Sequence, residues 1–220
     1  MDDFVAPAPT DHTSIPNFVR PVAFLSEGKV NDTRIQIRDT PPDLRLAMWT
    51  PERGWHVGYL PNYHTATLTR GLTIWMSDTP MELETNAVAM RAAHGDVLEC
   101  GLGLGYFSYN VARSPAVKKL DILEYNRDLE TLVYEKVKNE KTSIQFVNDA
   151  RDWLQANADL PRKQRKLYDL IHIDIWAGPN EPHEHFSEMH RLARPSLKKG
   201  GVTICWLEGT RPYPHWAYRL

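Results

Sequence analysis

The 220-residue chain is poor in cysteine, with only Cys100 and Cys205, and it has no apolar run near the ~20 residues that span a bilayer. Its charge is almost balanced, with 26 Lys and Arg against 28 Asp and Glu. Two cysteines do not make a disulfide scaffold, so we expect buried thiols in a cytoplasmic protein. The lack of a basic excess and of a long apolar run argues against nucleic-acid and membrane partners. The start, MDDFVAPAPTD, is acidic and Pro-rich, the opposite of a secretory signal.

Turn signals and hydrophobic periodicity divide the chain into three parts. Residues 1–17 contain three prolines and predict a flexible tail. Residues 18–74 alternate short β-like stretches with turns and predict a small antiparallel β unit. Residues 75–220 begin with a helical pattern over 77–93 and then form the main domain.

Strand and helix patterns alternate through the rest of that main domain. Such alternation predicts an α/β fold, a Rossmann-like and mostly parallel sheet with helices on both faces. The expected strands are 96–102, 118–126, 143–149, 168–176 and 201–209, and the expected helices are 105–114, 127–139, 150–158 and 183–197.

Three glycines, Gly101, Gly103 and Gly105, follow the first strand at alternate positions in VLECGLGLGYFS. Glycine is costly in regular structure, so three together predict a backbone that approaches a ligand closely, with a plain tight turn as the alternative. The dinucleotide pattern G-x-G-x-x-G is not met, because Tyr106 stands at its last position. There is no Gly-Lys-Ser/Thr either, which argues against a triphosphate.

Acidic residues lie in or at the end of each of the first three strands of the main domain. Glu124 comes about 20 residues after the glycines, where an acid accepts hydrogen bonds from ribose hydroxyls. Asp149, followed by the small Ala150, suits an adenine amine, or it caps the next helix. Glu99, before the first glycine, can face a ligand's ammonium group, directly or through water. Acids without Lys or Arg in the loop indicate a ligand with a cationic end and no phosphate, and S-adenosylmethionine is such a ligand.

These motifs in order, E-x-G-x-G-x-G, the acid ending the second strand and D-A after the third, resemble the class I S-adenosylmethionine-dependent methyltransferase fold over residues 75–208. The segment IWMSDTPMELE resembles its spermidine-synthase-like branch and, more distantly, guanidinoacetate-type N-methyltransferases. The resemblance implies S-adenosyl-L-methionine as the cofactor. It also implies a catalytic or substrate-contacting role for Asp78, with helix capping as the alternative.

The end of the fourth strand carries the residues expected to act on the substrate. Asp174 sits where both families place a functional acid, and it would orient or deprotonate the acceptor and contact the cofactor, or cap a turn. Trp176 would pack over the adenosyl or substrate site, or else cover a hydrophobic core. Glu82, His183 and His185 are further candidate substrate contacts. We expect no metal, because no Cys or Asp joins these histidines at ligand spacing.

The leading hypothesis is a methyltransferase that acts on N or O of a small molecule or short peptide. The alternatives are aminopropyl transfer, lysis or cyclisation of the aminoacyl chain with release of methylthioadenosine, and a non-catalytic binding module. Ala177 stands where spermidine synthases carry a second Asp, which argues against aminopropyl transfer. The short stretch after Glu208 leaves no room for a terminal hairpin, so we expect an edge strand that a homodimer could cover.

Overall fold

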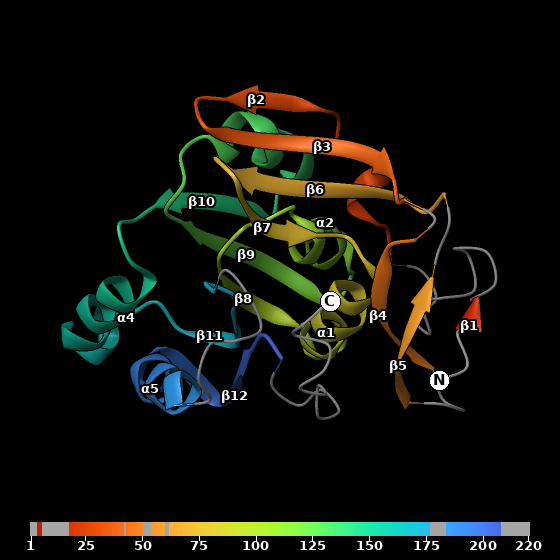
Figure 1. Cartoon of the computed structure of the whole chain (residues 1–220). Helices are drawn as coiled ribbons and strands as arrows, with labels where there is room; N and C mark the ends of the chain where they lie inside the picture. The colour runs from red at the N-terminus through yellow and green to blue at the C-terminus, as the bar shows by residue number, and fades with distance from the viewer. Residues whose placement is uncertain are drawn as a thin grey trace.

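The computed structural model describes residues 4–5, 18–41, 43–50, 54–59, 62–176 and 184–207. At its centre is a five-stranded sheet, all parallel, in the order β10-β9-β8-β11-β12 (Figure 1). Its strands are β8 (Gly95–Cys100), β9 (Val117–Glu124), β10 (Thr142–Phe146), β11 (Tyr168–Ile173) and β12 (Leu197–Cys205). The order reverses between β8 and β11, as in Rossmann-like sheets, so the predicted fold class is confirmed.

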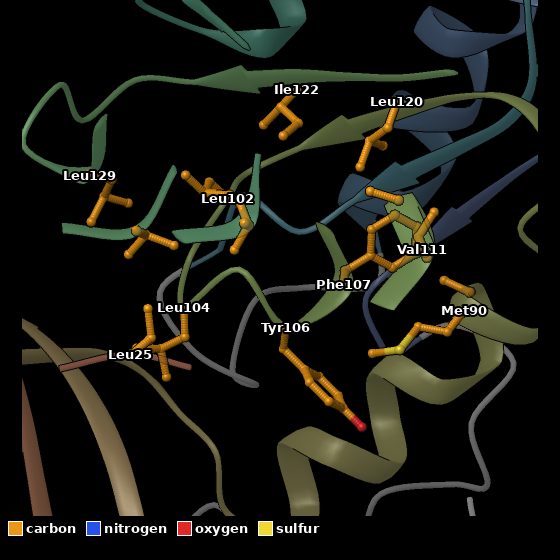
Figure 2. Close-up of a cluster of buried hydrophobic side chains, with 14 of the residues drawn as sticks. Leu25, Met90, Leu102, Leu104, Tyr106, Phe107, Val111, Leu120, Ile122 and Leu129 are labelled. Carbon is orange, nitrogen blue, oxygen red and sulfur yellow. The ribbon is translucent and has the colours of Figure 1, made fainter. Parts of the chain in front are cut away.

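Alternate side chains of each strand point to opposite faces of this sheet. Both faces carry hydrophobic side chains, and helices cover both. On one face Val97 packs with Phe107 and Val111 of α2, in the core cluster drawn in Figure 2. On the other, Leu98 packs with Leu154 of α4. The helices and single turns are α1 (Pro80–Ala92), α2 (Tyr106–Arg113), α3 (Glu135–Val137), α4 (Ala150–Asp159), α5 (Glu184–Ala193), η2 (Pro21–Ala23), η4 (Arg162–Gln164) and η5 (Arg194–Ser196). No helix within the described ranges is long and apolar enough to cross a membrane.

Three helices differ from the sequence prediction at their ends or in their type. The helix expected over 183–197 ends at Ala193, because the 3-10 turn η5 follows it and β12 begins at Leu197. The helix expected over 77–93 begins only at Pro80, since the preceding strand extends to Ser77. The helix expected over 127–139 is a π-helical turn, η3 (Glu130–Tyr134), followed by the short α3.

The region expected to form one antiparallel β unit forms two sheets. The first is antiparallel, in the order β2-β3-β6-β7, and the second has the order β1-β5-β4 (Figure 1). Within the stretch predicted as a flexible tail, β1 pairs in parallel with β5. The strands are β1 (Phe4–Val5), β2 (Gly28–Val30), β3 (Thr33–Asp39), β4 (Arg45–Thr50), β5 (Gly54–Tyr59), β6 (His64–Arg70) and β7 (Thr73–Ser77).

The two cysteines are buried and form no disulfide, as predicted. Cys100 of β8 and Cys205 of β12 both pair with Ile173, from opposite sides of β11. Their backbones are therefore two strand spacings apart, roughly 10 Å. That separation is too long for a disulfide.

Candidate functional site

A cavity lies at the carboxyl ends of β8, β9 and β11, and the β6–β7 hairpin also lines it. This is the position at which sheets with this strand order bind ligands. The sequence-predicted residues that line it are Glu82, Gly101, Gly103, Glu124, Asp149, Ala150, Asp174 and Trp176. Four other predicted residues within the described ranges do not line it: Asp78, Glu99, Gly105 and His185.

The three glycines of the loop after β8 meet different surroundings. A Cβ on Gly101 would lie 1.9 Å from the carbonyl oxygen of Asp174, so this glycine lets the ends of β8 and β11 approach each other. A Cβ on Gly103 would lie 2.5 Å from the sulfur of Met76, at the cavity wall. Gly105 instead packs against two valines of η3 and α3. The loop therefore both shapes the cavity and fits two elements together.

Glu124, the last residue of β9, is buried, and its carboxylate accepts three backbone hydrogen bonds. The N–H of Leu102 donates to Oε2 at 2.7 Å, and the N–H groups of Tyr125 and Asn126 donate to Oε1 at 2.9 and 2.7 Å. Burial raises the pKa of Glu124, and these donors oppose that rise. A carboxylate accepts about four hydrogen bonds, so Oε2 retains room for one ligand hydroxyl.

Asp149 caps α4, which was the alternative interpretation of this residue. Its Oδ1 accepts the backbone N–H of Arg151 at 2.8 Å, and its Oδ2 is paired with the Arg151 guanidinium at 3.2 Å. Asp149 and Ala150 still line the cavity, so capping and a ligand contact are compatible.

Two carboxylates line the cavity from different elements: Asp174 directly follows β11, and Glu82 lies in the first turn of α1. Asp174 follows β11, and its backbone N–H donates to Cys100, which fixes the main chain beside the glycine loop. Burial, followed by the charge of Glu124, raises the pKa of Asp174 to about 7. Burial, followed by the charge of Asp174, raises the pKa of Glu82 well above its usual range.

Asp78, the predicted catalytic or substrate-contacting residue, does not reach the cavity. It is 1% exposed, and its carboxylate accepts hydrogen bonds from Val22, Thr65 and Ala66 and pairs with Arg20. These donors occupy both oxygens, so the predicted role of Asp78 has no support in this geometry. The capping alternative was wrong, since Thr79 is the N-cap of α1.

Glu99, predicted to face the cofactor, is covered by α2. It lies on the same side of β8 as Val97, and its carboxylate accepts the hydroxyl of Ser108. Burial raises the pKa of Glu99 well above its usual range, and Ser108 opposes that rise. Direct contact with a ligand in the cavity is therefore not available to this side chain.

The aromatic and histidine predictions have mixed outcomes. Trp176 is 8% exposed, lines the cavity and packs edge-on against Phe186 of α5. His185 lies in α5, away from the lining, whereas His183 falls outside the described residues. Among the described residues no group of three or more His, Cys, Asp or Glu is placed to hold a metal ion.

Part of the cavity wall was missed by sequence reasoning. Residues of the β unit and residues that follow strand ends also line the cavity, including Arg70, Trp75, Met76, Tyr125 and Trp206. Trp75 stacks on Tyr125 at 5.4 Å between ring centroids, and the Arg70 guanidinium bonds the Tyr125 hydroxyl at 2.5 Å. Tyr125 could have been found, because it follows Glu124 directly. Trp75 and Met76 belong to the segment IWMSDTPMELE that carried the resemblance, whereas Arg70 belonged to no motif.

Comparison with known proteins gives structural likenesses only, since no family model and no curated protein matches the chain. Spermidine synthase from Thermotoga maritima is 16% identical with a TM-score of 0.47, covering 82% of this chain and 55% of its own. Human methyltransferase-like protein 13, in complex with SAH, is 17% identical with a TM-score of 0.40, covering 56% and 58%. The chain thus spans little more than half the length of either. At these levels the likenesses do not establish what the present chain binds.

Proposed function

We propose that the chain is an S-adenosylmethionine-dependent transferase, and that it transfers the methyl group to N or O of a small molecule or short peptide. One observation carries the proposal. The glycine loop, Glu124 and Asp174 converge on a single cavity at the point where the strand order of a Rossmann-like sheet reverses.

The residues that line the cavity fit this cofactor. Glu124 is buried with one acceptor position left on Oε2, which suits a ribose hydroxyl. Gly103 lines the cavity and has no side chain to fill it, and the glycine loop contains no Lys or Arg that would bind a phosphate. Glu82, Glu124 and Asp174 favour a ligand with positive charge.

When bound, S-adenosylmethionine would supply an electrophilic methyl group, because its sulfonium sulfur can keep the electrons of the C–S bond that breaks when the acceptor's lone pair bonds the methyl carbon. The chain's own residues then have three tasks: to hold the acceptor in line with the methyl carbon, to exclude water and to take up the acceptor's proton. Positioning alone is worth ~7–11 kcal/mol in comparable reactions. Asp174, as a carboxylate, is placed to accept the proton.

Two measurements test the proposal. Calorimetric titration with S-adenosylhomocysteine should show stoichiometric binding, and its absence in folded protein would refute the cofactor assignment. Incubation with S-adenosylmethionine and acceptor mixtures, followed by product analysis, should release S-adenosylhomocysteine. Release of methylthioadenosine would instead identify chemistry on the aminoacyl chain.

A further inference from the structure

Two basic segments lie at the edge of the parallel sheet opposite the cavity. Residues 162–166, RKQRK, form η4 and the approach to β11, and residues 194–199, RPSLKK, form η5 and the start of β12. Together they hold seven of the 26 Lys and Arg of the chain and none of its 28 Asp and Glu. The rest of the chain is therefore acidic, and the near-balanced total charge does not show how basic this edge is.

A buried side chain holds the two segments together. Asn157 of α4 is 5% exposed, and its amide nitrogen donates to the carbonyl oxygen of Lys166 at 2.9 Å and to the hydroxyl of Ser196 at 2.7 Å. Its amide oxygen accepts the N–H of Lys166 at 3.0 Å. Tyr168 and Leu197 pair at the start of β11 and β12, and α4 and α5 lie side by side (Figure 1). The two basic segments are therefore fixed next to each other although they are far apart in the sequence.

Most of the charge in these segments is not neutralised. Of the seven cations, only Lys198 is paired with acids within the described ranges, Asp96 at 2.6 Å and Asp169 at 2.8 Å. The other six are exposed, apart from the half-buried Arg165, and we call them the basic surface: Arg162, Lys163, Arg165, Lys166, Arg194 and Lys199. Like charges on one surface repel one another, and a bound polyanion removes that repulsion.

The composition of the basic surface favours a nucleic acid over an acidic protein as the polyanion. Protein–protein interfaces have an apolar core, whereas interfaces with nucleic acids are more polar and more positively charged. Neither basic segment contains an exposed large hydrophobic side chain, and Leu160, 40% exposed, only borders the first. Three of the six cations are arginines, whose planar guanidinium groups match phosphate oxygens in bidentate geometry.

The same composition indicates which part of a nucleic acid is bound. The two segments contain no aromatic residue on which a base could stack. Contacts from Lys and Arg to phosphate oxygens position a protein on a nucleic acid but carry no sequence information. Binding at the basic surface should therefore depend on salt and not on base sequence.

We propose that the basic surface binds the sugar–phosphate backbone of a nucleic acid without reading its bases. The surface lies at the amino ends of β11 and β12, whereas the cavity lies at the carboxyl ends of the strands. The inference is thus independent of the proposed function. It departs from the expectation that the total charge gave, because a local excess of charge decides binding at one surface.

The first test measures binding of the full chain to short labelled DNA and RNA duplexes, each in two unrelated sequences, by fluorescence anisotropy. Affinities for the two sequences should agree within about 2-fold. Affinity should fall about 100-fold between 50 mM and 200 mM salt, as about four phosphate contacts would give. Binding of either duplex in this manner supports the inference and shows which nucleic acid is preferred. No binding at 50 mM salt, or an affinity that salt does not change, would overturn it.

A matched pair of double variants locates the effect. Lys163→Gln with Arg194→Gln removes two charges from the basic surface and should weaken duplex binding about 10-fold or more. Lys29→Gln with Arg34→Gln makes the same changes at exposed residues of β2 and β3 and should leave binding unchanged. Circular dichroism and thermal unfolding check that both variants fold. Unchanged duplex binding in the folded first variant, or equal losses in both, would refute the assignment.

A third comparison separates a nucleic acid from other polyanions. The probes are polyglutamate with the same total charge as the duplex and vesicles that contain phosphatidylserine, at the same salt concentration. Both should bind about 10-fold or more weakly than the duplex. If polyglutamate binds as tightly as the duplex, the surface fits an acidic protein and the inference fails. Equally tight binding of the vesicles would identify a membrane surface instead and would also overturn it.

Discussion

Glu124 and Asp174 are two carboxylates at the ends of strands in one sheet, and their surroundings give them different tasks. Glu124 accepts three backbone N–H groups, so it organises the loops around it and stays rigid. The Asp174 carboxylate has no hydrogen-bond partner among the described residues, while its main chain is fixed by Cys100. The first arrangement suits binding, and the second suits proton transfer.

Asp174→Asn should lower single-turnover rates about 100-fold or more and leave cofactor affinity nearly unchanged. The wild-type rate should increase as pH rises through about 7, because a base acts only when deprotonated and burial raises the pKa of Asp174 to about 7. The rate of Asp174→Asn should not show this increase with pH. Rapid-quench measurements at saturating cofactor decide the matter, and equal rates would remove Asp174 from the mechanism.

Glu124→Ala should lower the stability of the protein even without a bound ligand. It leaves three backbone donors without their acceptor, at about 1 kcal/mol or more each, so the free energy of unfolding should fall by roughly 3 kcal/mol. Glu124→Gln keeps one acceptor oxygen and should cost less. Urea unfolding measures both, and equal stability of wild type and Glu124→Ala would contradict the bonding described.

At the scale of elements, the site depends on how closely the loop after β8 approaches the end of β11. Gly101 permits that approach, and the β6–β7 hairpin contributes Met76 beside Gly103. The cavity is thus built from two sheets, since β7 belongs to the antiparallel sheet and β8 to the parallel one.

Comparing Gly101→Ala with Gly71→Ala separates two causes of lost stability, the steric clash of a new Cβ and the strain of a left-handed backbone. Both glycines have positive φ, at 97° and 57°, but a Cβ on Gly71 meets nothing within 4 Å. Gly71→Ala should cost about 1–2 kcal/mol through its left-handed backbone alone. Gly101→Ala must also displace Asp174 and should cost more than about 3 kcal/mol. Chemical denaturation compares them, and similar losses would show that the close approach is unimportant.

At the scale of the whole molecule, the β unit and the parallel sheet share one hydrophobic core. Leu25 and Ile35 lie in the same buried cluster as Leu104, and Figure 2 shows Leu25 next to Leu104. Asp128, just before η3, accepts hydrogen bonds from Asn31 and Thr33 across the junction. The two parts therefore stabilise each other.

We expect a single cooperative unfolding transition because of this shared core. Calorimetric and van't Hoff enthalpies should agree, as they do for a two-state unit. Two resolved transitions would mean that the β unit unfolds independently of the parallel sheet.

A homodimer remains a prediction. Within the described residues β12 is the last strand of the parallel sheet, and Val202 on it is 42% exposed. Edge strands of this kind pair readily with a second copy. Light scattering should give twice the monomer mass, and a monodisperse monomer at high concentration would reject the dimer.

The sequence by itself determined the parallel sheet, the glycine loop and the acids at strand ends, because hydrophobic periodicity and strand–loop order are local properties. Only the tertiary structure decided which acids reach the cavity. Asp78 and Glu82 lie on one short segment, yet the first is enclosed by donors of the β unit and the second lines the cavity together with Asp174. Such contacts join residues far apart in the chain, so no local pattern specifies them.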